Sequence, residues 1–197
     1  MPRITFGRPS AERLRVGTRQ FKYESAAYDA RLRLRSFCGT QPEQCRAIYE
    51  YAIMSDYSVS PLVQAAIGAG IDPAAVVVSQ GHVYVVNVGD GTISQYNIAS
   101  DETLMPMNPA TVTNAGMHTF GVARSTATVD PTGSFLYVTN AADNTLSRFS
   151  IASDGQLSPL TPSTVATGVE PVSIVVAPVA DSPSGYYQCL LHRLCSV

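Results

Sequence analysis

The stretch TGSFLYVTNAADNTLSRFSI at residues 132–151 decides the fold, because it has the pattern of two short β-strands joined by a polar turn. The first strand ends in Tyr-Val-Thr-Asn, and the second alternates apolar and polar residues, as a strand with one buried face does. Nearly the same pattern, GHVYVVNVGDGTISQYNI, occupies residues 81–98. Asn, Asp and Gly between the strands tolerate the backbone angles of tight turns. Two copies of one hairpin predict a repeat architecture.

The repeat is confirmed within the sequence by columns that keep register over three copies. IYEYAI at 48–53, ISQYNI at 93–98 and LSRFSI at 146–151 follow one another at offsets of 45 and 53 residues. Each is followed closely by a similar octapeptide, namely SDYSVSPL, SDETLMPM or SDGQLSPL. Repeats of about 40–50 residues built from short strands are typical of β-propeller blades.

Each unit predicts four antiparallel strands. An apolar run such as AAVVVS comes first, and HVYVVN or FLYVTN second. The alternating strand is third. The fourth contains prolines, which favour an edge strand because proline donates no ladder hydrogen bond. No helical pattern of 10–15 residues separates the strands, so a parallel α/β sheet is disfavoured. The fold class predicted is all-β, with β-propeller blades in a partial or open propeller.

These residues also carry a family resemblance. YVTN at 137–140, YVVN at 84–87, VDPTG at 129–133 and SDGQLSPL at 153–160 resemble the YVTN repeats of the seven-bladed lactonase-like propellers. That group includes the 6-phosphogluconolactonase type. The resemblance covers roughly residues 46–187 and implies the fold more specifically than the activity, since similar repeats occur in surface and binding proteins.

The blade count predicts an incomplete ring. Residues 70–113 and about 117–166 supply two whole blades, and residues 47–66 and 169–187 supply two partial ones. A closed propeller takes 4–8 blades. Three explanations stay open: a piece of a longer propeller, several copies assembling into one ring, or an open structure capped by the N-terminal residues. We expect a basic N-terminal extension at 1–45, a partial propeller at 46–187 and a divergent tail at 188–197.

The resemblance implies a catalytic role for two residues, His118 and Arg124, in the insertion that lengthens one unit. Lactone hydrolysis needs a base to activate water and a cation to stabilise the oxyanion. Carried over residue by residue, only this His and this Arg match the His and Arg groups of the family. His118 lies twelve residues before Asp130, a longer spacing than the family pattern leads us to expect. A polar loop residue is the alternative interpretation.

Other residues that could carry chemistry have simpler interpretations. Asp130, Asp154 and Asp181 are predicted turn formers, because each lies within a few residues of Gly or Pro. The column formed by Asp56, Asp101 and Asp154 predicts an architectural role, because it recurs in every unit. The four cysteines, Cys38, Cys45, Cys189 and Cys195, have spacings wider than structural zinc knuckles. Free thiols are therefore favoured over zinc or disulfides. We expect no cofactor and no metal.

Charge separates the two parts of the chain. Ten of the thirteen Lys and Arg lie in residues 1–46 with only four acids, whereas the remainder carries a net charge of −8. Such asymmetry is typical of a tail next to a domain. No nucleic-acid motif accompanies RLRLR at 31–35, so nucleic acid is not an expected partner. The sequence predicts no membrane span, no secretory signal and a cytoplasmic location.

Two functions from different classes follow. One is hydrolysis of a sugar lactone of the 6-phosphogluconolactone type, with a small lactone or sugar phosphate as ligand. The other is a non-catalytic scaffold whose blades bind a protein or a surface. A truncated product without independent function is the third interpretation. Self-association of several copies is one of the open routes to a closed ring.

Overall fold

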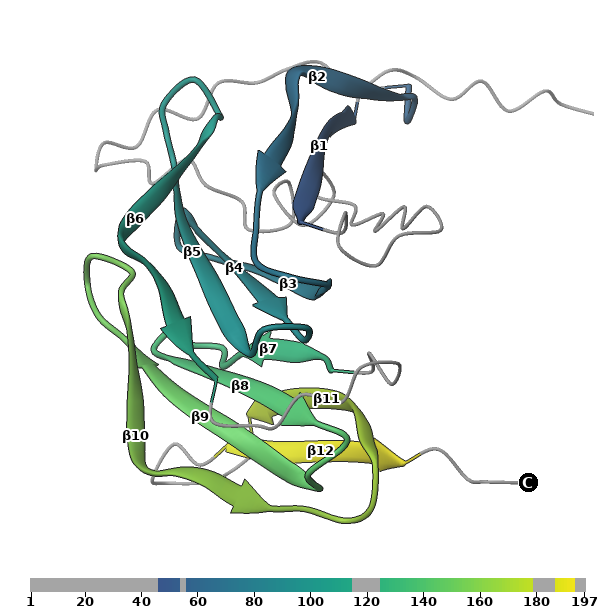
Figure 1. Ribbon diagram of the computed structural model, residues 1–197, viewed down its shortest axis with the longest axis vertical. Helices are drawn as coiled ribbons and strands as arrows, with labels where there is room; N and C mark the ends of the chain where they lie inside the picture. The colour runs from purple at the N-terminus through teal and green to yellow at the C-terminus, as the bar shows by residue number, and fades with distance from the viewer. Residues whose placement is uncertain (1–45, 54–55, 115–124, 179–186, 194–197) are drawn as a thin grey trace, which may run out of the picture.

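The structure, a computed structural model, describes residues 46–53, 56–114, 125–178 and 187–193, which contain twelve β-strands and no helix (Figure 1). The strands are, in chain order, β1 (Ala47–Ile53), β2 (Val59–Gly68), β3 (Pro73–Ser79), β4 (His82–Asn87), β5 (Thr92–Ile98), β6 (Leu104–Thr113), β7 (Ala127–Val129), β8 (Phe135–Asn140), β9 (Thr145–Ile151), β10 (Leu157–Ala166), β11 (Pro171–Pro178) and β12 (Tyr187–Arg193). They form four antiparallel sheets, which confirms the predicted all-β fold class.

Two of the sheets are complete blades, and two are half-blades. The complete blades have the strand orders β3-β4-β5-β6 and β7-β8-β9-β10, whereas β1-β2 and β11-β12 are two-stranded. The proline-containing strands β6 and β10 are edge strands, as the sequence predicts. Hydrogen-bonded ladders need an N–H at every inner position, so the prolines are accommodated only at the outside.

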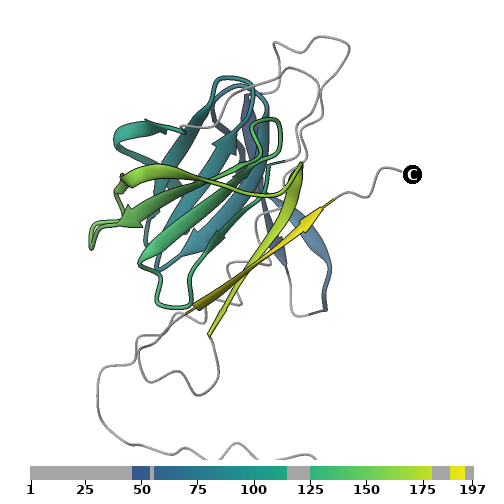
Figure 2. The ribbon, with the colours of Figure 1, turned by 90° about the horizontal axis from the view of Figure 1, so that it is seen from below.

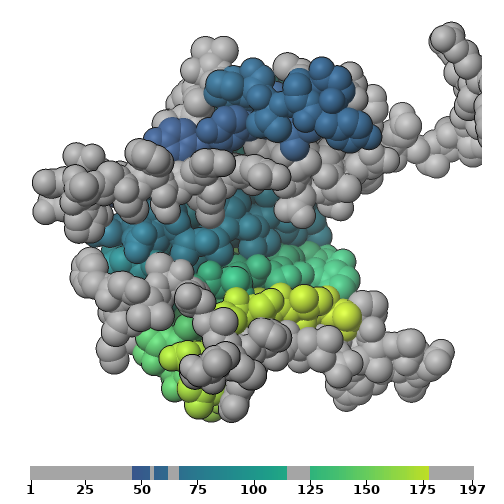
Figure 3. All heavy atoms as spheres, turned by 90° about the vertical axis from the view of Figure 1, so that its right-hand side faces the viewer, coloured from purple at the N-terminus to yellow at the C-terminus, as the bar shows by residue number. Residues whose placement is uncertain are grey.

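The four sheets stack face to face in chain order (Figures 1 and 2). The innermost strands adjoin one another, because β7 contacts β3 on one side and β11 on the other. Figure 3 shows β1–β2 at one end of the stack and β11 at the other. The described sheets do not close into a ring, which agrees with the predicted partial propeller.

The core lies between the sheets rather than within any one of them. Tyr84, Leu136 and Phe149 are buried in a cluster that joins the two complete blades. Ile48 and Val83 belong to a second cluster, which joins β1–β2 to the first complete blade. Alternate residues of β4 therefore face two neighbours, and this is why HVYVVN is apolar almost throughout. Each fully buried aliphatic or aromatic side chain stabilises the stack by about 1.5–3 kcal/mol.

The C-terminal strand β12 extends further than the sequence indicates. The repeat pattern of the sequence predicts a propeller that ends at residue 187, whereas β12 pairs with β11 through Arg193. The YVTN pattern is absent from YQCLLHR. Strands pair through backbone N–H and C=O groups, so β12 can pair with β11 as an extended chain without the YVTN sequence of the repeat.

The repeated aspartates form turns, as predicted. The carboxylate of Asp56 accepts a hydrogen bond from the Ser58 N–H at 2.9 Å, and Asp101 and Asp154 accept equivalent bonds two residues ahead, each at 3.1 Å. These are Asx turns, which fix the hairpin between the third and fourth strands. Asp181 lies outside the described residues. Among the described residues no helix has the length and hydropathy to cross a membrane.

Candidate functional site

The connection from β6 to β7 is attached at both ends to strand β8. Where it begins, the Asn114 side-chain amide donates to Asn140 Oδ1 at 3.0 Å. Where it ends, Thr126 N–H donates to Thr139 Oγ1 at 2.8 Å, and Thr139 N–H donates to the Thr126 carbonyl at 2.9 Å. This connection carries the two residues predicted to be catalytic, which lie outside the described residues. The structure therefore fixes the two ends of the connection.

An amide–hydroxyl cluster closes the turn after the second strand of each complete blade. Asn87 donates from Nδ2 to the hydroxyls of Thr92 and Ser94, at 3.0 and 2.9 Å. Asn140 makes the same two bonds one blade later, to Thr145 and Ser147, at 3.0 and 2.8 Å. The final Asn of each YVxN motif therefore has a structural role that was not predicted from the sequence. The sequence feature that indicates this role is the Asn-x4-Thr-x-Ser spacing, which occurs in both complete blades.

Glycine is required where the chain crosses from β2 to β3. A Cβ at Gly70 would lie 2.6 Å from both Asn87 Cγ and Asp90 Oδ2, which is too close for any side chain. The Asp90 carboxylate accepts the Ile71 N–H at 2.7 Å and the Thr92 hydroxyl at 2.7 Å. The crossing is thereby held against the turn that follows β4. Asp90 also serves here as a turn former, because it accepts the Thr92 N–H at 3.2 Å.

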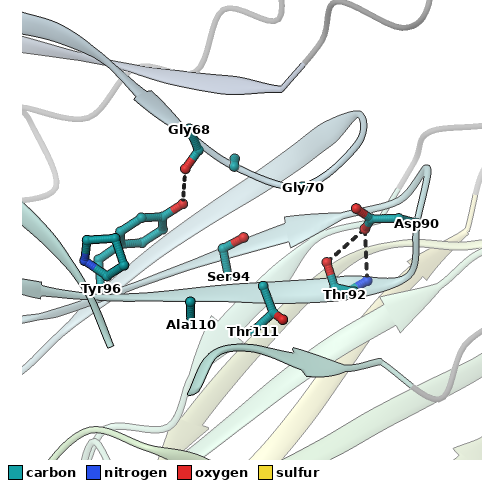
Figure 4. A pocket seen from close by; sticks show the side chains of 10 residues that line it. Gly68, Gly70, Asp90, Thr92, Ser94, Tyr96, Ala110 and Thr111 are labelled. Carbon is teal, nitrogen blue, oxygen red and sulfur yellow. Dashed lines mark hydrogen bonds between the residues drawn. The ribbon is translucent and has the colours of Figure 1, made fainter. Parts of the chain in front are cut away.

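A cavity of about 270 Å³ opens beside this crossing (Figure 4). It lies between the end of β2 and strands β5 and β6. Its lining residues, mostly small or polar, are Gly68, Ala69, Gly70, Asp90, Thr92, Ser94, Tyr96, Pro106, Ala110 and Thr111. Tyr96 crosses the cavity and donates from its hydroxyl to the Gly68 carbonyl at 2.6 Å. This volume lies just below the range of about 300–1,000 Å³ that is typical of ligand pockets.

The cavity's own residues supply no catalytic pair. Burial raises the pKa of Tyr96, and a hydrogen bond with Ser94 only partly offsets that effect, so the phenol is protonated at neutral pH. The Asp90 carboxylate is occupied by the three donors described above. None of the residues that line the cavity is a cation that could stabilise an oxyanion. The residues that line the cavity therefore do not supply the groups that lactone hydrolysis needs.

The remaining candidates from the sequence are structural where the structure describes them. His82 begins β4 at the other end of the sheet, and its Nδ1 is 2.9 Å from the side-chain oxygen of Asn97. Asp130 is buried in the turn between β7 and β8, where it accepts three backbone N–H groups. Cys189 lies in β12, and the other three cysteines lie outside the described residues. The described part of the chain holds no group of three or more metal-ligating side chains.

Comparison with known proteins gives the family. The model of the family described as "Lactonase, 7-bladed beta-propeller" matches residues 36–173, which is more than half of the 197-residue chain. None of the curated proteins matches this chain.

Three solved structures are similar to this chain at low sequence identity. A candidate 6-phosphogluconolactonase from Bacteroides fragilis is 16% identical with a TM-score of 0.56, over 77% of this chain and 51% of its own. The periplasmic gluconolactonase of Pseudomonas aeruginosa is 18% identical, also with a TM-score of 0.56, over 84% and 48%. A candidate 6-phosphogluconolactonase from Bacteroides uniformis is 19% identical with a TM-score of 0.55, over 75% and 41%. The chain thus spans about half or less of each structure, and at this identity the likeness shows the fold alone.

Proposed function

The chain belongs to the seven-bladed β-propeller lactonase family, and from this premise we propose that it acts in the hydrolysis of a sugar lactone of the 6-phosphogluconolactone type. The site proposed is the connection between β6 and β7, with His118 and Arg124 as its reactive residues. The observation that supports this site is the attachment of both ends of the connection to β8, through Asn114 and Thr126.

The proposed reaction needs one base and one cation. His118 takes a proton from water, and the water oxygen attacks the lactone carbonyl carbon. Arg124 donates hydrogen bonds to the oxyanion that forms. The carbonyl then re-forms as the bond to the ring oxygen breaks, and the ring oxygen takes the proton from His118. The product is an open-chain hydroxy acid, and no cofactor is consumed.

The test is a hydrolysis assay on the full chain with glucono-δ-lactone and its 6-phosphate. Acid release is followed with a pH indicator and compared with the rate without protein. We expect His118→Ala to lower kcat by about 100-fold or more, and Arg124→Ala by a similar factor. His82→Gln is the matched control, because this His begins β4 at the other end of its sheet, and its turnover should equal that of the wild type.

Two results would contradict the proposal in different ways. Wild-type turnover that persists in both variants would remove His118 and Arg124 from the mechanism while keeping the activity. A wild-type rate equal to the rate without protein would reject hydrolysis by this chain, and the non-catalytic scaffold would then be the better interpretation.

Two finer expectations from the sequence are also proposals. We propose that copies of the chain associate to complete the ring, which would give the site the walls of a closed channel. We also propose a cytoplasmic location, which cell fractionation tests. One of the similar structures is a periplasmic protein, so recovery in an exported fraction would contradict that location.

A further inference from the structure

The two half-blades are complementary parts of one blade. β1 and β2 correspond to the third and fourth strands of a complete blade, because IYEYAI of β1 aligns with ISQYNI of β5 at the offset of 45 residues. β11 and β12 correspond to the first and second strands, because Pro171 of β11 aligns with Pro73 of β3 at the offset of 98. The described strands thus contain each half of a blade once.

The pairing of β11 with β12 reproduces the pairing of β3 with β4 residue by residue. In the complete blade, Pro73 pairs with Asn87, and the register shifts before Ala75. In the half-blade, Pro171 pairs with Arg193, and the register shifts at the same place, before Ser173. β12 therefore occupies the position of a second strand with the same bulge, even though its sequence has lost the repeat.

Each half-blade has one edge where a complete blade continues. In complete blades the second strand pairs with the third, as β4 does with β5. In the described part of the chain, β12 pairs only with β11, and β1 pairs only with β2. Unpaired N–H and C=O groups along such an edge are a template for another strand. The edge of β12 lacks a third strand beside it, and the edge of β1 lacks a second strand beside it.

The outer face of β11 also lacks a cover that its counterpart has. Val77 of β3 is half-buried against the core cluster that contains Leu136 of the next sheet. Val175 stands at the equivalent position of β11, and its side chain is 54% exposed. Val169, just before β11, is 58% exposed. A following sheet would cover these apolar side chains.

We propose that β12 of one copy pairs antiparallel with β1 of a second copy, so that β11–β12 and β1–β2 form one four-stranded blade shared between two chains. The register follows from the complete blade, where His82 pairs with Asn97. It places Gln188 opposite Ala52, and Arg193 opposite Ala47, of the second copy. The sheet behind β1–β2 in that copy would then cover Val175.

A second copy is the occupant that the geometry favours. The two half-blades lie at opposite ends of the stack, so one chain cannot join its own edges (Figures 1 and 3). The edges differ from each other, so the contact is head-to-tail. The twelve strands of the described residues amount to three blades, so two copies joined at both ends contain six blades, one fewer than the seven of the family and within the 4–8 of closed propellers. This inference concerns assembly and does not depend on the proposed hydrolysis.

Cysteine cross-linking tests the register directly. Ile98 N–H donates to the Gly81 carbonyl at 2.9 Å, which makes that a hydrogen-bonded pair. The next pair, His82 with Asn97, is therefore non-hydrogen-bonded, with Cα atoms about 4.5 Å apart, a separation that a disulfide spans. Its counterpart between copies is Gln188 with Ala52. A Q188C chain and an A52C chain carrying different tags are mixed, oxidised and mapped by mass spectrometry of the linked peptides.

The control mixes Q188C with Y57C, because Tyr57 is 88% exposed beyond the end of β1. We expect the Q188C–A52C link to exceed the control by at least tenfold, and wild-type light scattering to give twice the 21.0 kDa mass. Equal yields in the two mixtures, or a monomer at tens of micromolar protein, would overturn the proposal. A monomer with cooperative unfolding would overturn it as well, because the edges would then be stable without a second copy. Because no substrate is used, failure here leaves the proposed hydrolysis unaffected.

Discussion

The two complete blades have the same strand order, but the sheet that follows each of them along the chain differs. The first is followed by the second complete blade, and the second is followed by the half-blade β11–β12. Between the first and second, Tyr84 donates from its buried hydroxyl to the Gly155 carbonyl at 2.7 Å. The Leu157 N–H donates to the buried Gln95 Oε1, also at 2.7 Å. In the second blade, Gly155 lies in the turn between the third and fourth strands, and Leu157 is the first residue of the fourth strand. A complete neighbour thus turns residues of the repeat into bonds between sheets.

On its other face, the second complete blade contacts the half-blade β11–β12, and the residues equivalent to Tyr84 and Gln95 differ there. Tyr137 occupies the column of Tyr84 and is half-buried, whereas Tyr84 is fully buried. Arg148 occupies the column of Gln95 and donates to the Pro162 carbonyl, but its buried Nε has no partner in the described part of the chain. The difference shows that the contacts of equivalent residues depend on the sheet that lies beside a blade as well as on the repeat itself.

The largest expected effect concerns the turns between the first and second strands, which the two blades build differently. In the first blade, Gln80 and Gly81 both have positive φ, 48° and 84°, and the turn needs no side chain. In the second blade, Asp130 accepts the N–H groups of Thr132, Ser134 and Phe135 at 2.7–3.0 Å.

Asp130→Ala should lower the free energy of unfolding by about 3 kcal/mol, because buried donors lose a charged acceptor. Urea denaturation measures the change. Asp154→Ala is the matched control, since this exposed turn carboxylate accepts only the Gln156 N–H, and it should cost under about 1 kcal/mol. Equal losses in free energy of unfolding in the two variants would show that the Asp130 carboxylate stabilises the fold no more than an exposed turn carboxylate does.

The same carboxylate gives the turn a pH dependence. Desolvation raises the pKa of Asp130, but hydrogen bonds from Thr132, Phe135 and Ser134 outweigh it and hold the pKa below its ordinary value of 3.8. A carboxyl group with a lowered folded pKa stabilises the fold above pH 3.8, and that contribution is lost as the pH falls through the folded pKa. Denaturation between pH 2 and 6 should therefore show an acid-side loss in the wild type that is smaller in Asp130→Asn. Identical slopes would assign the acid sensitivity to other groups.

A smaller effect distinguishes the amide–hydroxyl clusters. Asn140 uses both ends of its amide, since its Oδ1 also accepts from Asn114. Asn87 makes the two hydroxyl bonds, while its buried Oδ1 has no partner among the described residues. Asn140→Ala should therefore cost about 2–3 kcal/mol and Asn87→Ala about 1–2 kcal/mol, because more buried polar atoms lose their partners in the first. Thermal or urea unfolding of the pair checks the order, and a larger loss in Asn87→Ala would reverse the interpretation.

The sequence predicts the blades well because their determinants are periodic. The 45- and 53-residue offsets locate the strands, and the prolines of β6 and β10 identify the edges. The same reasoning misses β12, since strand pairing there depends on the backbone and on β11 and not on the repeat. It also misses the partners of Asn87 and Asn140, because their hydroxyls become neighbours only once the turn is formed.

The candidate site is less predictable for a related reason. The unit that contains His118 and Arg124 is eight residues longer than the preceding one, so no column of the repeat fixes where those residues lie. Only the family resemblance assigns them a role. Asn114 and Thr126, which hold the ends of that connection, were not singled out because their partners are in β8, distant in sequence.

The smallest expected effect would remove the difference between the two clusters. Ala69 precedes the first complete blade as Asn114 precedes the second, at the offset of 45, and their N–H groups make equivalent bonds, to the Arg46 and Gly91 carbonyls. Asn114 supplies the amide that completes the Asn140 cluster, and Ala69 has no such group. Ala69→Asn should therefore donate to Asn87 Oδ1 and raise the free energy of unfolding by about 0.5–1 kcal/mol.

The gain should depend on Asn87, so the double-mutant cycle with Asn87→Ala measures it. In that background Ala69→Asn should give no gain, because the acceptor is gone. Ala69→Ser is the control, since its shorter side chain does not carry an amide donor as far. A gain that persists without Asn87 would mean that position 69 acts through local backbone preference. The absence of any gain would mean that the two blades differ in the path of the connection and not only in one side chain.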